Sequence, residues 1–132
     1  MAPDRVTLTV PAKGEYAKTV RMSAAALGAR MGMSYDEVDD LKMAVDEAFT
    51  YAVDTLSPES EVVMVFDVGD EALEVCVHVG RSEEHEDEDG EAREEFATFI
   101  LDSVCEAHEF VSHEDGSRTL KLVTRCGSID GD

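Results

Sequence analysis

The clearest periodic pattern in the chain lies between Ser34 and Leu56. Its apolar residues recur every three or four positions, which places them along one side of an α-helix. These residues are Val38, Leu41, Val45, Ala48, Ala52 and Leu56. Ser34 and Glu37 have the spacing of a capping box at the start, and Pro58 marks the stop. The pattern predicts a helix with one buried face and a signal at each end.

Two other stretches share this spacing. From Glu15 to Met31 the apolar residues predict a first helix, and Gly32 is well placed to end it. Glycine readily adopts the left-handed conformation that a helix C-terminus often needs. A third helix is predicted from about Ala92 to Glu106, beginning its apolar face at Phe96.

Stretches of alternating or β-branched residues predict five strands. They are Arg5–Val10, Glu61–Val68, Ala72–Val79, Glu109–Ser112 and Arg118–Thr124. Gly69-Asp70 predicts a hairpin between the second and third strands, and Asp115-Gly116 predicts a turn between the last two. The order of strand, two helices, two strands, helix and two strands predicts an α+β fold. Its architecture would be a two-layer sandwich of a mostly antiparallel sheet and helices.

Length and charge limit the class of protein. The 132 residues have room for one compact domain, expected to span 1–132. Eleven basic and 31 acidic residues give a net charge of -20, which disfavours direct binding to nucleic acid or to a membrane surface. The same charge would attract a basic partner, although acidic surfaces also serve solubility alone.

No apolar run is long enough to span a bilayer, and no secretory signal is seen, so we expect a cytoplasmic location.

Two segments have little to bury. Residues 81–91 carry seven carboxylates and predict a solvated, mobile loop, and residues 126–132 predict a short flexible tail.

The three cysteines, Cys76, Cys105 and Cys126, lack a CxxC pair and predict packed, reduced thiols. The four histidines lack the paired spacing of ligands, so no metal site is predicted from them.

The central helix carries a motif. The run DLKMAVDEAFTYAV resembles that of the anti-sigma factor/serine-protein kinase family, where it typically reads DLK.AV.EA.TNAV. These bacterial proteins are relatives of the ATP-binding domain shared by gyrase and the sensor histidine kinases. VPAKGEYAKTVRM resembles the family's opening strand and helix, and FILDSVCEAHEFVSHEDGSRTLKLV resembles its closing part. The resemblance implies the histidine-kinase-like ATPase fold, over nearly the whole chain.

The resemblance also implies a site, which this chain has altered. Glu47 matches the family's acidic residue, a general base toward the hydroxyl to be phosphorylated, and Tyr51 replaces the asparagine that holds Mg²⁺. A phenol is a poor ligand for Mg²⁺, and its ring would occupy space meant for phosphate and metal. Losing the metal ligand should cost on the order of a thousandfold in rate. Asp46, Glu47 and Asp54 could form a substitute metal cluster, but they are also typical of a solvated helix face.

Two further elements of the resembled ATP site are missing. Val79 or Gly80 stands where the family reads adenine with an aspartate, and neither side chain can accept the amino proton. The glycine-rich lid is replaced by EDEDGEAREEF, in which Gly90 is the one glycine among carboxylates that repel a triphosphate. Bound ATP and Mg²⁺ are therefore not expected, and Glu47 would be vestigial as a catalytic residue.

The residue expected to contact a protein partner is retained, unlike the residues of the resembled ATP site. Arg21 falls where family members carry a first-helix arginine that contacts the sigma factor or the competing anti-anti-sigma protein. A guanidinium makes forked hydrogen bonds to carboxylates, which suits such a contact. The alternative is an ordinary surface arginine paired with a nearby acid.

The resemblance thus implies a bacterial transcription regulator of the kind used in stress responses, which can form homodimers. Our first hypothesis is an anti-sigma factor, a degenerate kinase that sequesters a sigma factor and is released by an anti-anti-sigma partner. The second is an active serine/threonine-protein kinase that phosphorylates an anti-anti-sigma protein with Mg-ATP. A third is an adaptor that has lost sigma binding.

Overall fold

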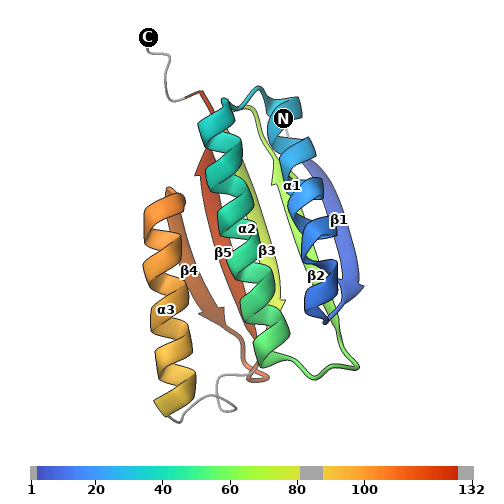
Figure 1. Ribbon diagram of the computed structural model, residues 1–132, viewed down its shortest axis with the longest axis vertical. Helices are drawn as coiled ribbons and strands as arrows, with labels where there is room; N and C mark the ends of the chain where they lie inside the picture. Colours follow the sequence, from blue (N-terminus) through green and yellow to red (C-terminus); the bar gives the residue numbers. More distant parts are fainter. Residues whose placement is uncertain (1–2, 81–87, 128–132) are drawn as a thin grey trace.

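A computed structural model describes residues 3–80 and 88–127 of the chain. The strands are β1 (Asp4–Pro11), β2 (Glu61–Val68), β3 (Ala72–Val79), β4 (Ala107–Ser112) and β5 (Arg118–Arg125). The helices are η1 (Gly14–Tyr16), a 3₁₀ turn, and α1 (Ala17–Met31), α2 (Tyr35–Thr55) and α3 (Glu88–Val104). The strands form one antiparallel sheet in the order β1-β2-β3-β5-β4. Figure 1 shows α1, α2 and α3 side by side over one face of this sheet, which confirms the α+β sandwich.

The alternation along the strands decides which sheet face is covered. In β3, Leu73, Val75, Val77 and Val79 are buried, whereas the residues between them are half-buried or exposed. His78 is on the less buried side and is exposed. Because side chains point alternately to the two faces of a strand, this pattern turns one row toward the helices and the other away. The predicted hairpin between β2 and β3 is confirmed, with Val65 opposite Cys76.

The central helix forms as its sequence predicts. The Ser34 hydroxyl accepts a hydrogen bond from the Glu37 amide at 3.1 Å, and the Ser34 amide donates to the Glu37 carboxylate at 2.8 Å. Both halves of the capping box are therefore present. The predicted apolar stripe of α2 faces the core: Leu41, Val45, Ala48 and Ala52 are fully buried. Because α2 packs against both α1 and α3, its side chains can be reached from two neighbouring helices.

Element boundaries differ from the prediction at the third helix. α3 begins at Glu88, so the last part of the predicted acidic loop is helical. Glutamate is a good helix former, and its charge is favourable near a helix N-terminus, which explains the earlier start. β4 begins at Ala107 instead of Glu109, because the Glu106 amide already donates to the Val123 carbonyl at 2.9 Å. The rest of the predicted loop, 81–87, and of the tail, 128–132, lies outside the described residues.

Gly32 ends α1 with φ +87°, the left-handed conformation expected of it. The three cysteines are free and half-buried, and burial raises the pKa of the Cys105 thiol to about 12. Within the described part of the chain, no helix is both long and apolar enough to cross a membrane.

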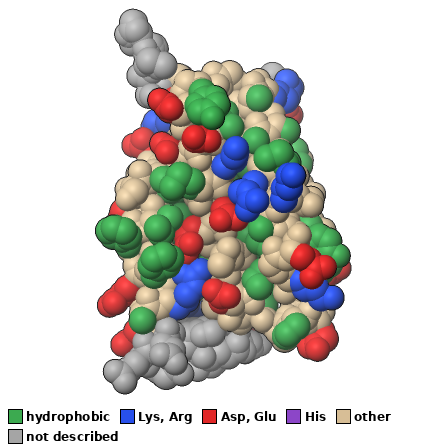
Figure 2. All heavy atoms as spheres, viewed as in Figure 1, with side chains coloured by type: hydrophobic (Ala, Val, Ile, Leu, Met, Phe, Trp, Pro, Cys, Tyr) green, Lys and Arg blue, Asp and Glu red, His purple; other side chains and the backbone are tan. Residues whose placement is uncertain are grey.

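Figure 2 shows the helical face, where acidic side chains are widely spread and basic ones gather over α1 and the adjoining side of α2.

Candidate functional site

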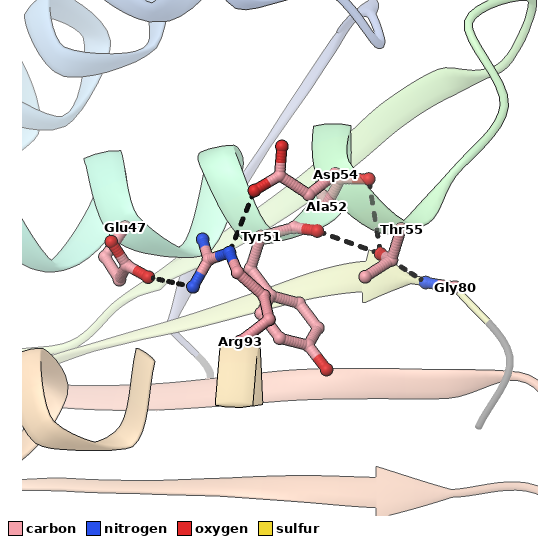
Figure 3. Close-up of polar contacts among 7 residues, drawn as sticks. All are labelled: Glu47, Tyr51, Ala52, Asp54, Thr55, Gly80 and Arg93. Carbon is pink, nitrogen blue, oxygen red and sulfur yellow. Dashed lines mark hydrogen bonds and ion pairs between the residues drawn. The ribbon is translucent and has the colours of Figure 1, made fainter. Parts of the chain in front are cut away.

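The centre of the candidate site is an arginine from α3 that reaches the acidic side of α2. The Arg93 guanidinium donates to Glu47 at 2.7 Å and to Asp54 at 2.8 Å (Figure 3). Glu47 and Asp54 lie seven residues apart, which is two helical turns, so they flank one face of α2. The side chains of Arg93 and Glu47 are 21% and 11% exposed. This pair is largely removed from water, and the guanidinium supplies the positive charge that the two carboxylates share.

Tyr51 lies between these two carboxylates on α2, beneath the guanidinium. Its side chain is 1% exposed, and the Arg93 guanidinium carbon is 5.2 Å from the ring centroid. The opposite contact is with Phe110 of β4, whose ring centroid lies 5.1 Å away. Burial raises the pKa of the Tyr51 phenol, so the hydroxyl stays protonated at neutral pH. The phenol is packed into the layer between helices and sheet, one turn along α2 from Glu47.

A second arginine, Arg118 of β5, supports Tyr51 from the sheet. It donates to the Tyr51 hydroxyl at 3.3 Å and to Glu94 of α3 at 2.9 Å, and it lies over the Phe110 ring at 4.5 Å. Its side chain is 7% exposed. A buried cation is stable only when its donors are used, and here they bind a phenol and a carboxylate. Arg118 thus ties α2, α3 and β5 together around one ring.

The possible substitute metal cluster does not assemble. Asp46 turns toward α1 and accepts a hydrogen bond from Arg21 at 2.9 Å, whereas Glu47 and Asp54 face Arg93. In residues 3–80 and 88–127, no group of three or more histidine, cysteine, aspartate or glutamate side chains could hold a metal ion. A divalent cation at Glu47 would have to displace the guanidinium of Arg93 from its two carboxylates.

Arg21 is half-exposed on α1, and its ion pair with Asp46 is open to water. The side chains are 36% and 40% exposed. This is the arrangement that an ordinary surface arginine would have, and it leaves the guanidinium accessible to another carboxylate. α1 also carries Lys18 and Arg30 and has no acidic residue, so this helix is basic in an acidic protein.

Gly80, which follows β3, is one of the two positions, with Val79, where the resemblance places the adenine-reading aspartate. Its amide donates to the Thr55 hydroxyl at 2.9 Å, and that hydroxyl donates to the Tyr51 carbonyl at 2.9 Å (Figure 3). A Cβ atom added to Gly80 would lie 2.2 Å from the Thr55 carbonyl oxygen. Glycine is needed here because the end of the strand approaches the backbone of α2 too closely for a side chain.

A cleft of about 510 Å³ opens beside Gly80. Its described lining comprises Thr55, Leu56, Ser57, Ser60, His78, Val79, Gly80, Asp115 and Ser117. Val79 is 1% exposed and packs into the core, so it presents no polar group there. Asp115 accepts hydrogen bonds from both the amide and the hydroxyl of Ser117. The described lining is therefore polar through hydroxyl groups and the His78 imidazole, and the Asp115 carboxylate is hydrogen-bonded within its own turn.

The sequence prediction missed Arg93 and Arg118, the two residues that organise this site. Arg93 is the one basic residue within EDGEAREEFATFILDSV, and a lone cation among acids on a helix is a usable signal for an ion pair. Arg118 starts a strand and offers no such signal. Its partner Tyr51 is 67 positions away in the sequence.

Comparison with known proteins agrees with the fold. The model of the histidine kinase-like ATPase domain matches residues 10–119. The serine-protein kinase RsbW of Bacillus subtilis (strain 168) is 42% identical over 77 residues, covering 56% of this chain and 48% of that protein. The RsbW of Bacillus cereus (strain Q1) is 34% identical over 76 residues, with the same coverage. This chain thus matches about half the length of these curated relatives.

A solved structure adds evidence on the fold alone. The crystal structure of the RsbU and RsbW domains of Rv1364c from Mycobacterium tuberculosis superposes with a TM-score of 0.68 at 18% identity, covering 93% of this chain and 32% of that chain. The resemblance drawn from the motif of the central helix is confirmed by these matches. The chain belongs to the histidine kinase-like ATPase family.

Proposed function

We propose that this protein is an anti-sigma regulatory factor of the partner-switching type, with ATP binding and kinase activity lost or strongly impaired. It would sequester a sigma factor and be released by an anti-anti-sigma partner. The relatives named serine-protein kinase support the regulatory class. The single observation that carries the loss of catalysis is the position of Arg93, paired with both Glu47 and Asp54 above the buried Tyr51 ring.

The charges around Glu47, Tyr51 and Arg93 oppose the binding of Mg-ATP. In the resembled kinases the residue in place of Tyr51 holds Mg²⁺, but a buried neutral phenol cannot replace that ligand. A metal-bound triphosphate beside Glu47 would have to break two short ion pairs and uncover the Tyr51 ring. The end of β3 also lacks a carboxylate for adenine, since a side chain at Gly80 would collide with α2. These obstacles arise from α2, α3 and β3 separately.

The partner surface supports the other half of the proposal. Arg21 lies on the basic helix α1, and its pair with Asp46 is half-exposed, so a carboxylate from another protein can take the place of Asp46 at little cost. The rest of the protein is strongly acidic, which suits a basic partner such as a sigma factor. Binding would then combine long-range attraction with local contacts at Arg21.

The second candidate is an active serine/threonine-protein kinase, with Mg-ATP as cofactor. One observation favours it: Glu47 is retained on α2, and the Arg93 beside it carries a guanidinium that can bind phosphate as well as carboxylate. In that case Arg93 would leave Glu47 when nucleotide arrives. The two candidates differ in whether nucleotide binds at all.

Thermal unfolding with and without Mg-ATP separates the candidates. A ligand present at a hundred times its dissociation constant stabilises the folded state by about 2.7 kcal/mol. We expect no shift in the melting temperature of this protein at millimolar Mg-ATP, with Bacillus subtilis RsbW as the positive control. A clear shift, or phosphate transfer to an anti-anti-sigma protein that is lost in Glu47→Ala, would establish the kinase instead.

Binding to a sigma factor is tested with the sigma factors of the source organism, each purified separately. We expect one of them to bind the protein, and Arg21→Glu to weaken that binding by at least about tenfold, which is 1.4 kcal/mol. Arg30→Glu is the matched control, because it makes the same charge change at an exposed position of the same helix. If no sigma factor or anti-anti-sigma protein binds the wild-type chain, the adaptor hypothesis replaces this one.

A further inference from the structure

The outer side of α3 presents two large aromatic side chains to solvent. Phe96 is 56% exposed and Phe99 is 68% exposed, whereas Phe49 and Phe66 are fully buried in the core. Residues three apart on a helix lie on the same side, so the two rings form one apolar surface. Figure 2 shows apolar side chains gathered on the side of the molecule where α3 lies. Exposed aromatic rings in this arrangement are typical of a contact surface.

Met43 of α2 extends this apolar surface. It is 52% exposed and lies one turn before Glu47, on the side of α2 that faces α3. The Arg93 guanidinium lies 5.8 Å from the centroid of the Phe96 ring, which holds that ring beside the α2–α3 contact. The apolar surface made by Phe96, Phe99 and Met43 is called the α3 patch below.

Carboxylates border the α3 patch. Glu95 and Asp102 are exposed and stand four residues before and three residues after Phe99, which puts one acid on each side of that ring along the helix. Glu91, Glu94, Glu95 and Thr98 line a hollow of about 420 Å³ beside α3. An apolar centre with an acidic border is complementary to a segment with an apolar centre and a basic border.

We infer that the α3 patch is a docking site for a cationic amphipathic helix of a partner protein. The aliphatic face of that helix would cover Phe96 and Phe99, and its lysine or arginine side chains would enter the hollow lined by Glu91, Glu94 and Glu95. A second copy of this chain fits poorly, because each copy carries a net charge of -20 and would bring one acidic border against another.

This surface differs from the one proposed around Arg21. α2 lies between α1 and α3 in the helical layer, so the two surfaces are on opposite flanks of the domain (Figure 1). The signs of charge differ as well, since α1 carries basic residues and no acidic ones. The inference therefore does not require the proposed function: the α3 patch can bind its helix whether or not Arg21 contacts a sigma factor.

The test uses the full chain and a synthetic 18-residue peptide of leucine and lysine, with the leucines on one helical face. Titration followed by amide chemical shifts should move the signals of α3, with little change in α1. Phe96→Ser combined with Phe99→Ser should weaken binding by about tenfold or more, as expected for aromatic residues at the centre of a contact. Met22→Ser combined with Tyr35→Ser removes exposed apolar side chains elsewhere and should leave the affinity unchanged.

Separate controls test the acidic residues of α3 and the order of residues in the peptide. Glu91→Gln with Glu95→Gln should weaken binding and reduce its salt dependence, more than Glu15→Gln with Glu61→Gln, which removes the same charge from exposed positions on η1 and β2. A peptide of the same composition with its leucines scattered should bind more weakly. Equal binding of the scattered peptide, or full binding by the double serine variant, would overturn the inference. So would a homodimer, measured by sedimentation, that the Phe96→Ser and Phe99→Ser changes dissociate.

Discussion

The two flanks of α2 use the same chemistry in different surroundings. Toward α1, Arg21 meets Asp46 at 2.9 Å, and toward α3, Arg93 meets Glu47 at 2.7 Å. The distances are similar, but the first pair is 36% and 40% exposed and the second is 21% and 11% exposed. An ion pair in water contributes little because solvent already stabilises both charges, whereas a charge left alone in a buried place is costly.

Because the two ion pairs differ in exposure, the two flanks of α2 are expected to have different roles. The α2–α3 flank is held by contacts that depend on one another, since Tyr51 touches both Arg93 and Arg118. Removing Arg93 or Arg118 takes a hydrogen-bond partner from a largely buried group, Glu47 or the Tyr51 hydroxyl. The α1–α2 flank has a half-exposed ion pair, which suits the partner contact proposed at Arg21. Three measurements test this contrast, in order of the effect expected.

The largest effect should come from Arg118→Ala. This change leaves the Tyr51 hydroxyl without its donor, leaves Glu94 without its partner and removes the contact with the Phe110 ring. We expect the free energy of unfolding to fall by about 3 kcal/mol. Urea denaturation gives this value. Arg125→Ala is the control, because its pair with Glu106 is 54% and 53% exposed, and it should change stability by less than about 0.5 kcal/mol. Equal losses in both variants would refute the contrast.

A smaller effect, with a distinct dependence on pH, is expected for Tyr51→Phe. At neutral pH the loss of one hydrogen bond should cost about 1 kcal/mol. Burial raises the pKa of Tyr51 above its ordinary value of 10.0, so the folded state keeps the phenol proton after the unfolded chain has released it. This contribution is fully present below about pH 10 and is lost as the pH rises through the pKa of the folded state.

The measurement is the free energy of unfolding from urea titrations between pH 8 and pH 11. The wild type should lose stability with rising pH more steeply than Tyr51→Phe, because the variant has no phenol at this position. Tyr35→Phe serves as the reference for loss of a tyrosine, since the Tyr35 side chain is 82% exposed. Parallel curves for the wild type and Tyr51→Phe would show that the ring is hydrated in solution.

The smallest effect should belong to Arg21 and Asp46. A double-mutant cycle with Arg21→Ala and Asp46→Ala should give a coupling energy below about 1 kcal/mol, because both side chains remain in contact with water. The coupling should decrease further in high salt. A coupling above about 2 kcal/mol would mean that the pair is structural, which would weaken the case for a partner contact at Arg21.

Much of the fold was predictable from local patterns. The capping box of Ser34 and Glu37, the left-handed Gly32 and the hairpin through Gly69-Asp70 each depend on residues close together in the sequence. The motif around Glu47 also lies within a single helix. The start of α3 was predicted four residues late, because the acidic segment has no apolar stripe and periodicity alone does not register helix propensity.

The contacts that decide the chemistry were not predictable in this way. Arg93 and Glu47 are 46 positions apart, and Arg118 and Tyr51 are 67 apart. From the sequence, Asp46, Glu47 and Asp54 were candidates for a metal cluster or for a solvated helix face. In the structure Asp46 pairs with α1 and the other two pair with α3, while Asp46 and Asp54 stay half-exposed.

The sequence by itself determined the order of the elements, the apolar side of α2 and the family motif with its tyrosine at position 51. For α3 the prediction was wrong at Phe96 and Phe99, which are exposed, whereas Ala97 and Leu101 face the core. Only the tertiary structure decided that two arginines enclose this tyrosine and that Asp46 turns away from Glu47. The reason is physical: hydrogen-bond patterns and helical periodicity act over a few residues, whereas the energy of a charge depends on what the folded chain places around it.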